Sequence, residues 1–367
     1  MLTRSKPLHQ QVEEFVRGQI ASGEFVPGSR LPSTSALAKM TGASVFTVQT
    51  ALVRLYREGL LDRQANRATY VKGETPALTC AGVYFNRPFA RADSAFYQVL
   101  GQELRQRLNK EGVKVRAWID EREEAEQSEP VASLKRAMEK REIQALIAPL
   151  ICGNDLQWLQ EAPVPTALLT TDLSIQNRVS GNPRKMLRLS LMELKKQGCR
   201  TVGVISNMLM QADLTHSAAM DFYRSIVDLA NELGMQIRNT WIRFPQEYTP
   251  HLAHFGYEQF HALWDLPQRP EGLLVYPDGM ATGVITAILE RRLNVPQELK
   301  VAFHANDLLP YVCPFPATFL LTKVGSFADA LIRMIRTQLE GGQVRPVQIP
   351  ISVVREGMDP FSLTPAG

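Results

Sequence analysis

Apolar residues recur at helical spacing in three short runs at the start of the chain. The first run predicts an amphipathic helix that ends before Gly23, with apolar positions at Leu8, Val12, Phe15, Val16 and Ile20. The second predicts a short helix that Ser33 caps and Gly42 ends. The third predicts a helix capped by Ser44, with an apolar face formed by Val45, Val48, Leu52, Leu55 and Tyr56.

Two short β segments follow the third helical run. They lie at 60–63 and 68–71, on either side of a polar turn in which Asn66 tolerates the positive φ of a tight hairpin. The order helix, short helix, turn, helix, hairpin is typical of a winged helix-turn-helix, whose second turn helix enters the major groove of DNA. The pattern predicts an α+β DNA-binding domain over residues 1–73 and a linker at 74–79.

From residue 80 onward, nearly continuous apolar segments alternate with amphipathic helical runs. Ten apolar segments predict strands, at 81–85, 113–119, 143–150, 165–170, 201–206, 237–244, 272–277, 300–303, 317–322 and 347–354. Short apolar strands that alternate with helices are typical of parallel sheets covered on both faces. Residues 80–367 are therefore expected to form two α/β lobes with a cleft between them. Crossings between the lobes are expected near 174–180, 305–316 and 341–347.

Charge is unevenly distributed between the two parts of the chain. The formal net charge is +4, but residues 1–73 carry ten basic and five acidic residues and therefore a net charge of +5. The remaining residues carry 31 basic and 32 acidic side chains, a net charge of −1. A compact basic module on a nearly neutral body is consistent with nucleic-acid binding by the N-terminal domain.

Composition narrows the class of protein further. Of 367 residues, 45% are hydrophobic and 21% are charged, which is typical of a soluble globular protein. No stretch reaches the ~18 uninterrupted apolar residues of a membrane helix, so neither membrane insertion nor secretion is expected. The four cysteines are Cys80, Cys152, Cys199 and Cys313. Because they lie far apart in the sequence, they are expected to be reduced thiols of a cytoplasmic protein.

Residues 6–72 contain an ordered series of short motifs. They are LHQQV at 8–12, PGSRLPS at 27–33, LA at 37–38, Ser44, TV at 47–48, AL at 51–52, Leu55 and EGL at 58–60. Together they resemble the DNA-binding domain of the GntR family. The resemblance implies that the start of the third helix and the wing contact an operator. The residues expected to bind DNA are Arg30, Ser33, Ser44, Phe46, Thr47, Gln49, Thr50, Arg63, Asn66 and Arg67.

The sequence departs from this family where bases are recognised. Arginines that are usual in the second helix and at the start of the third are replaced by Ser35, Val45 and Gln49. Because bidentate Arg–guanine contacts are the commonest specific base contacts, the usual operator of the family is not assumed. Gln49 can instead recognise adenine, and Phe46 can contact a thymine methyl group. The alternative is that Gln49 is solvated at the flank of the helix and Phe46 packs against protein.

The body carries a second ordered series of motifs. They are AGV at 81–83, Asn86, FY at 96–97, Gly101, QALI at 144–147, PVP at 163–165, GCRTVG at 198–203, PEGLL at 270–274, Asp278, VP at 295–296 and VRE at 354–356. They resemble the effector domain of LacI-type regulators, which has the fold of periplasmic sugar-binding proteins. The expected fold is therefore a winged helix-turn-helix joined to a two-lobed, periplasmic-binding-protein-like α/β domain.

This second resemblance implies an effector bound between the lobes, against loops at the carboxyl ends of the strands. The residues expected to bind it are Asn86, Arg87, Phe89, Tyr97, Asp172, Asn207, Asp278 and His304. Candidate aromatic faces for a sugar ring, with the core or the surface as the alternative, are Phe89, Tyr97, Trp241 and Tyr276. An Arg and a late-strand Asp that commonly hold sugar hydroxyls in the family are replaced at Ala218 and near His304. The effector is expected to be a sugar or a sugar derivative.

Motifs for catalysis are absent from the sequence. The chain lacks G-x-S-x-G, P-loop, G-x-G-x-x-G and H-E-x-x-H segments, so it is not expected to be an enzyme or to bind a cofactor. His251 and His254 are spaced i, i+3 on a predicted helix, but a metal site would need a further ligand, so no metal is expected.

The two parts together predict a ligand-responsive transcriptional regulator, expected to be a repressor. It is expected to bind a pseudo-palindromic, double-stranded operator as a homodimer. Effector binding is expected to close the lobes and to change the spacing between the winged helices. Two alternatives remain open: a GntR-type regulator fused to a pyridoxal-phosphate aminotransferase-like domain, and a regulator whose cleft has lost ligand binding.

Overall fold

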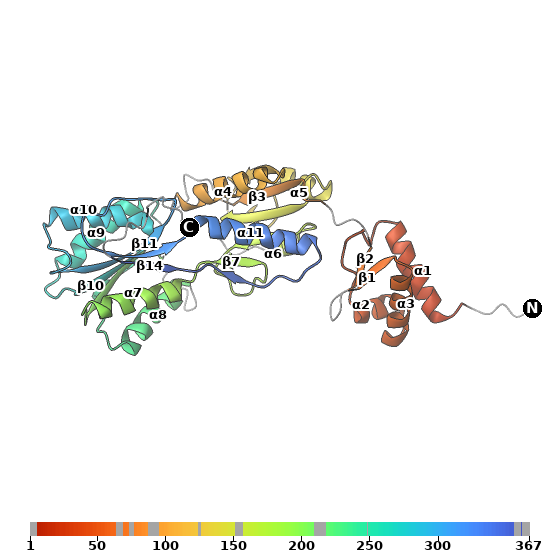
Figure 1. The fold of residues 1–367 in the computed structure, drawn as a ribbon, viewed down its shortest axis with the longest axis horizontal. Coiled ribbons are helices and arrows are strands. Elements are labelled where there is room, and N and C mark those ends of the chain that lie inside the picture. Colours follow the sequence, from red (N-terminus) through yellow and green to blue (C-terminus); the bar gives the residue numbers. More distant parts are fainter. Residues whose placement is uncertain are drawn as a thin grey trace, which may run out of the picture.

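The computed structural model describes residues 6–63, 69–72, 77–86, 95–123, 126–150, 157–208, 218–247, 249–355 and 361. The chain forms an N-terminal domain and two α/β lobes, with the first lobe between the N-terminal domain and the second lobe (Figure 1). Four residues predicted in binding sites lie outside the described residues, and they are Asn66, Arg67, Arg87 and Phe89. Within the described ranges, no helix is long and apolar enough to cross a membrane.

The N-terminal domain is the predicted winged helix-turn-helix. Its elements are α1 (Leu8–Ala21), α2 (Thr34–Thr41), α3 (Val45–Arg57) and the antiparallel strands β1 (Leu61–Arg63) and β2 (Thr69–Val71). Ser33 caps α2 by accepting a hydrogen bond from the amide of Ala36 at 3.1 Å. Gly42 ends the helix at φ 68°, a conformation that glycine adopts without a steric penalty. The core is formed by Val12, Val16, Leu37, Val48, Leu52 and Leu55.

The buried face of α3 is narrower than the sequence pattern predicts. Val48, Leu52 and Leu55 are buried as predicted, together with Ala51. The prediction is wrong for Val45 and Tyr56, which are 49% and 45% exposed. Both lie in the terminal turns of α3, beyond the central part that packs on α1 and β1.

The first lobe is built on a parallel six-stranded sheet of order β13-β7-β6-β5-β3-β4. Its strands are β3 (Cys80–Phe85), β4 (Lys114–Ile119), β5 (Ala145–Leu150), β6 (Thr166–Leu169), β7 (Arg178–Ser180) and β13 (Val347–Gln348). The helices α4 (Phe96–Lys110) and α11 (Val324–Leu339) pack on one face. The helices α5 (Ala132–Glu139) and α6 (Gln157–Gln160) pack on the other.

The second lobe repeats this arrangement with the order β14-β12-β11-β10-β8-β9. Its strands are β8 (Val202–Ser206), β9 (Ile242–Arg243), β10 (Gly272–Tyr276), β11 (Lys300–Asn306), β12 (Thr318–Thr322) and β14 (Ser352–Val354). Here β14 is antiparallel to β12. One face is covered by α7 (Pro183–Lys196) and α8 (Ala218–Glu232), the other by α9 (Leu252–Trp264) and α10 (Ala281–Glu290).

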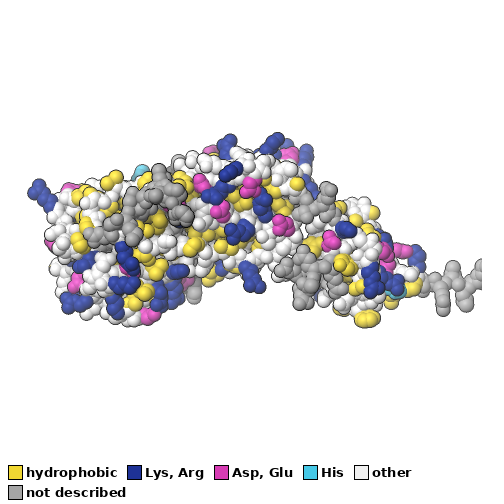
Figure 2. All heavy atoms as spheres, in the orientation of Figure 1, with side chains coloured by type: hydrophobic (Ala, Val, Ile, Leu, Met, Phe, Trp, Pro, Cys, Tyr) yellow, Lys and Arg dark blue, Asp and Glu magenta, His cyan; other side chains and the backbone are white. Residues whose placement is uncertain are grey.

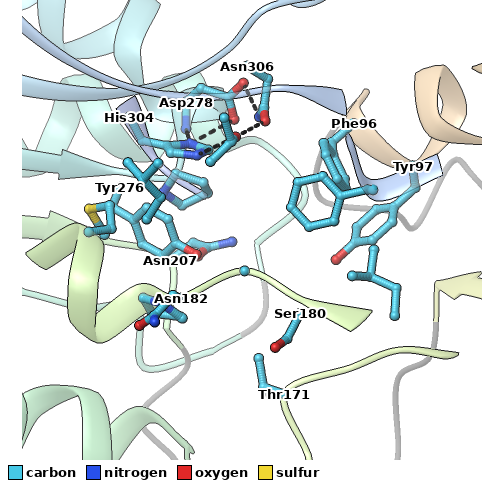
Figure 3. Close-up of a pocket in the computed structure, with 18 of the residues that line it drawn as sticks. Phe96, Tyr97, Thr171, Ser180, Asn182, Asn207, Tyr276, Asp278, His304 and Asn306 are labelled. Atoms are coloured by element: carbon cyan, nitrogen blue, oxygen red, sulfur yellow. Dashed lines mark hydrogen bonds and ion pairs between the residues drawn. The ribbon is translucent and has the colours of Figure 1, made fainter. Parts of the chain in front are cut away.

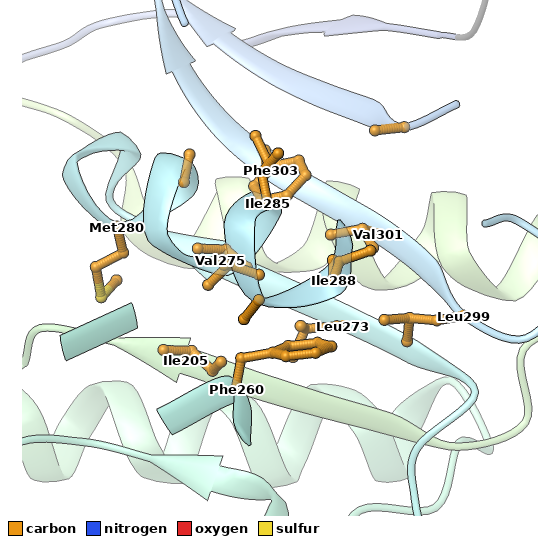
Figure 4. Packing of buried hydrophobic residues seen from close by; sticks show 14 of the residues in the cluster. Ile205, Phe260, Leu273, Val275, Met280, Ile285, Ile288, Leu299, Val301 and Phe303 are labelled. Atoms are coloured by element: carbon orange, nitrogen blue, oxygen red, sulfur yellow. The ribbon is translucent and has the colours of Figure 1, made fainter. Parts of the chain in front are cut away.

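Alternation of side chains along the strands separates two cores in the second lobe. Val275 and Phe303 pack with Phe260 of α9 and Ile288 of α10 (Figure 4). The residues next to them in sequence, Leu274 and Ala302 among them, face α7 and α8 instead. Strands buried on both faces read as continuous apolar runs, which is why the sequence located them.

The chain crosses between the lobes at 181–182, at 323 and at 349–351. The predicted crossing at 305–316 is wrong, because that segment joins β11 to β12, which are neighbours in the same sheet. The predicted crossing at 174–180 also needs correction, because its last three residues form β7 and the crossing follows directly after them.

Two predicted strands differ in the structure. The segment 347–354 is divided at Pro350, which lacks a backbone N–H, and its halves β13 and β14 belong to different lobes. The third crossing therefore lies after 341–347 and not within it. The segment 237–244 contains a 3-10 helix, η3 (Asn239–Trp241), and only two of its residues form a strand, β9.

Candidate nucleic-acid interface and ligand cleft

A side-chain cap fixes the first turn of α3. Ser44 is extended and accepts a hydrogen bond from the amide of Thr47 at 3.1 Å, and its Oγ lies 2.8 Å from Thr47 Oγ1. Thr50 Oγ1 donates a hydrogen bond to the carbonyl oxygen of Phe46 at 2.9 Å. A helix N-terminus carries a partial positive charge and attracts phosphate. The capped turn therefore combines a positive dipole end with two hydroxyl groups, a combination suited to a DNA backbone.

The side chains around this turn are open to solvent. Phe46 is 79% exposed, so the alternative in which it packs against protein does not hold in the described chain. Gln49 is also exposed. Arg30 is exposed beside β2, while the hydroxyl group of Ser33 is engaged in the cap of α2.

Basic residues of this domain are partly paired with carboxylates. Arg54 Nη1 lies 3.8 Å from Glu13 Oε1, and Arg17 forms an ion pair with Glu58. Arg63 lies in β1 opposite Thr69. On the face shown in Figure 2, Lys and Arg side chains are scattered over the body as well as over the N-terminal domain. The basic side chains on that face do not form a single patch. The candidate DNA interface is therefore argued from the geometry of α3.

A cleft of about 320 Å³ lies between the two lobes. The first lobe contributes Phe96, Tyr97, Thr171, Ser180 and Phe327 to its wall. The second lobe contributes Asn207, Tyr276, Asp278, His304, Asn306 and Thr322. In Figure 3 the rings of Phe96 and Tyr97 lie across the cleft from Tyr276 and Asn207. A ligand in this cleft would contact both lobes at once.

A chain of hydrogen bonds positions the one carboxylate among the described cleft residues. The amide of Asp278 donates to His304 Nδ1 at 3.3 Å, and His304 Nε2 lies 3.3 Å from Thr322 Oγ1. Thr322 donates to Asn306 Oδ1, and Asn306 Nδ2 donates to Asp278 Oδ2 at 2.9 Å. All four residues are at most 8% exposed. The chain ends on the Asp278 carboxylate and fixes its orientation.

The local electrostatics keep this carboxylate charged. Burial raises the pKa of the Asp278 carboxyl. The neighbouring His304 and the hydrogen bond from Asn306 lower it by more than burial raises it, so its pKa lies below the ordinary value. Burial and the negative charge of Asp278 raise the pKa of Tyr276 to about 12, so its phenol is protonated at neutral pH. The described wall thus combines an anionic acceptor, neutral amides and hydroxyls, and aromatic rings. That combination suits a hydroxylated ligand with an apolar face.

The structure brings four of the predicted effector residues together and leaves two apart. Tyr97, Asn207, Asp278 and His304 all line the cleft. Asn86 does not line it: the residue is buried, and its carbonyl oxygen accepts a hydrogen bond from Gln127 Nε2 at 2.9 Å. Asp172 does not line it either, because its carboxylate is engaged locally by the amide and hydroxyl of Ser174 at 2.8 and 2.7 Å.

Other cleft residues escaped the sequence analysis. Asn306 and Thr322 are the last residues of two apolar strands, a position at which ligand contacts are expected in parallel sheets. Tyr276, one of the candidate aromatic faces, lines the cleft. Trp241 instead is core, because it is 3% exposed and its indole donates to the carbonyl of Gln268 at 2.9 Å.

The wing of the N-terminal domain contacts the first lobe. The hydroxyl of Tyr70, in β2, donates a hydrogen bond to the carbonyl oxygen of Gly341, which follows α11. Gly341 has φ 72°, and a β-carbon there would lie 2.6 Å from the Tyr70 ring, so glycine is required at this contact. Phe327, near the start of the same helix, lines the cleft. A single helix, α11, therefore joins the cleft wall to the wing contact.

Comparison with known proteins finds a family match in each part of the chain. Residues 8–71 match the bacterial regulatory proteins of the gntR family, and residues 191–357 match the periplasmic binding protein-like domain. The mannosyl-D-glycerate transport/metabolism system repressor MngR of Escherichia coli is 44% identical over 69 residues, 19% of this chain and 29% of that protein. The repressor PurR of Glaesserella parasuis is 30% identical over 147 residues, 39% of this chain and 41% of that protein. In each alignment the chain spans less than half of the relative.

Solved structures resemble the body of the chain. A LacI transcriptional regulator of Bacillus cereus has a TM-score of 0.61 at 16% identity and covers 77% of this chain and 99% of its own. The transcriptional regulator CelR in complex with cellobiose has a TM-score of 0.60 at 13% identity. That alignment covers 89% of this chain and 100% of the CelR chain. At these identities the likeness shows the fold. The chain therefore carries a domain of the gntR family of bacterial regulatory proteins at residues 8–71, and this domain is joined to a body with the periplasmic-binding-protein-like fold.

Proposed function

We propose that this protein is a transcriptional repressor that binds a pseudo-palindromic operator as a homodimer and responds to a sugar or sugar derivative in the inter-lobe cleft. The observation that carries the proposal is the construction of the cleft. Both lobes line it, and the hydrogen-bonded chain from His304 to Asp278 orients a carboxylate in its wall. The likeness of the fold to a regulator in complex with cellobiose supports a sugar as the class of ligand.

The proposed DNA contacts are the ones predicted around α3 and the wing. Ser44 and Thr47 supply hydroxyl groups at the helix start, and Arg30, Arg63 and Arg67 supply positive charge to the phosphates. Thr47→Ala and Arg67→Ala are expected to weaken operator binding in a mobility-shift titration. Arg67→Ala should also reduce the slope of log affinity against log salt by about 1. Salt-independent binding by the wild-type protein would contradict this part of the proposal.

The proposed response to the ligand runs through α11. A ligand that contacts Tyr97 on one lobe and Asp278 on the other favours the closed arrangement of the lobes. The 16 residues of α11 span ~24 Å, with Phe327 of the cleft wall in its first turn. The loop after its last turn contains Gly341, whose carbonyl oxygen accepts the hydrogen bond from Tyr70. A shift of α11 on closure therefore moves the wing and changes the distance between the two wings of a dimer.

A thermal-shift screen tests ligand binding first. Neutral monosaccharides, disaccharides, amino sugars and uronates are added to the purified protein, because a ligand of the folded state raises its apparent melting temperature. The wild-type protein is expected to be stabilised by at least one class, and Asp278→Ala is expected to lose that shift. The same compound should then weaken operator binding.

Two alternatives have distinct outcomes. The aminotransferase-like alternative is not the observed fold, since the body consists of two six-stranded sheets of the periplasmic-binding-protein type. A regulator with a non-binding cleft would bind its operator, yet show no shift with any compound of the screen.

A further inference from the structure

Two neighbouring apolar residues are exposed at the start of α3. Val45 is 49% exposed and Phe46 is 79% exposed, although both are the kind of side chain that folding normally buries. They are the first two residues of the helix, directly after the Ser44 cap. In a helix-turn-helix this end of the second turn helix contacts the edges of the bases.

The position of Phe46 separates it from the core of its domain. The buried residues of α3 are Val48, Ala51, Leu52 and Leu55. At 100° per residue Phe46 projects about 200° away from Val48, on the opposite side of the helix. Its carbonyl oxygen is engaged by Thr50, but its ring lies open to solvent. The folded domain therefore gives no reason for a phenylalanine at this position.

The first turn of α3 also lacks an arginine or lysine, the side chains that recognise guanine through two hydrogen bonds. Its sequence is VFTV at 45–48, without a charged residue, and the next residue is Gln49. A bidentate Arg–guanine contact is therefore unavailable from this turn. In the major groove thymine alone among the bases presents a methyl group, and apolar side chains such as phenylalanine contact it.

We propose that Phe46, assisted by Val45, recognises thymine methyl groups, so that each half-site of the operator carries thymine where the first turn of α3 enters the major groove. The inference rests on the proposed DNA-binding function and adds the chemistry of recognition. The occupant of this apolar surface is the duplex, because the surface adjoins the dipole end of α3 in the basic domain of the chain. A protein partner at the same surface is the competing outcome of the test.

The test replaces thymine by deoxyuridine, which removes only the methyl group. The full-length protein first selects an operator from a randomised duplex library, and each selected thymine is then replaced in turn. At one or two positions per half-site the wild-type protein is expected to lose about three- to tenfold in affinity. Phe46→Ala is expected to bind the thymine and deoxyuridine duplexes equally. Without the phenylalanine ring, the thymine methyl group has no partner, so its removal should cost no further affinity.

Leu8→Ala provides the matched control, because Leu8 is a 60% exposed apolar residue of α1. This variant should retain the full sensitivity to deoxyuridine, and unchanged melting of Phe46→Ala confirms that it folds. An equal deoxyuridine penalty in wild type and Phe46→Ala, or an operator without thymine, overturns the inference while leaving DNA binding intact. Loss of self-association in Phe46→Ala with no deoxyuridine effect assigns the surface to a protein partner and also overturns it. Failure to select any sequence refutes the proposed function itself.

Discussion

At the scale of single residues, the buried carboxylate of Glu193 has its own basic partners. Glu193 of α7 is 5% exposed, and it accepts hydrogen bonds from Arg355 Nε at 2.8 Å and Nη2 at 3.0 Å. Lys196 Nζ donates to the same carboxylate at 2.7 Å. The Arg355 hydrogen bonds lower the pKa of Glu193 most, burial raises it, and the Lys196 hydrogen bond lowers it again, so that the pKa lies at about 2. Glu193 thus ties the chain after β14 to α7.

This pairing predicts a pH-dependent contribution to stability. The folded pKa of Glu193 lies below its unfolded value of 4.5, so the contribution is complete above about pH 5 and is lost as the pH falls towards 2. Both partners are largely exposed, so solvent screening reduces the value at neutral pH to about 1–2 kcal/mol. In urea unfolding, Glu193→Gln is expected to be destabilised by that amount at pH 7 and progressively less towards pH 3.

The control for this measurement is Glu232→Gln, which breaks an exposed ion pair with Arg188 at 2.7 Å. Its effect should stay below about 0.5 kcal/mol at every pH. Equal effects of the two substitutions, or a Glu193→Gln effect that does not depend on pH, would contradict the assignment.

At the scale of elements, the cap of α3 has two separable roles. Ser44 satisfies a free amide of the first turn, and it lies where a phosphate would approach the helix. Ser44→Ala is expected to lower the free energy of unfolding of the N-terminal domain by about 1 kcal/mol. Ser44→Asp keeps a capping oxygen and favours the helix dipole, so its stability should match wild type, while its charge repels phosphate and weakens operator binding at least tenfold.

Thermal melting and mobility-shift titration of both variants separate the roles. Val16→Ala truncates a buried core side chain of α1 and serves as the stability control. If operator affinity simply followed stability across the three variants, the phosphate role of Ser44 would be refuted.

Elements were predictable where local chemistry alone determines them. The three N-terminal helices follow from their caps and glycines, and the buried strands follow from continuous apolar runs. The short strand β7 was not predicted, because three residues are too few to show a hydrophobic pattern. The strands β13 and β14 were predicted as one strand, because apolar residues continue on both sides of Pro350. In the cleft, Asp278 and His304 were found from strand ends, whereas Phe96 enters from a helix that strand-end reasoning does not consider.

At the scale of the whole molecule, the contact between the wing and the first lobe was beyond sequence reasoning. Tyr70 and Gly341 are 271 positions apart, and neither belongs to a motif. Only the folded arrangement shows that α11 carries the cleft wall at one end and the wing contact at the other (Figure 1). A coupling free energy between the cleft and the operator has a physical route through this helix.

Tyr70→Phe tests that route with the smallest possible change. The variant keeps the ring beside Gly341 and removes only the hydroxyl that donates to its carbonyl oxygen, so the fold and the unliganded operator affinity are expected to change little. Ligand-induced loss of operator affinity, typically about 5- to 150-fold in allosteric proteins, should fall to a few-fold. Gly341→Ala should produce the same uncoupling, because the added methyl group clashes with the ring. Tyr257→Phe, which removes a hydrogen bond to Glu290 in the second lobe, should keep the full response. A full response in Tyr70→Phe and Gly341→Ala, measured by titrating ligand into the operator complex, would show that the signal reaches the wing by another path.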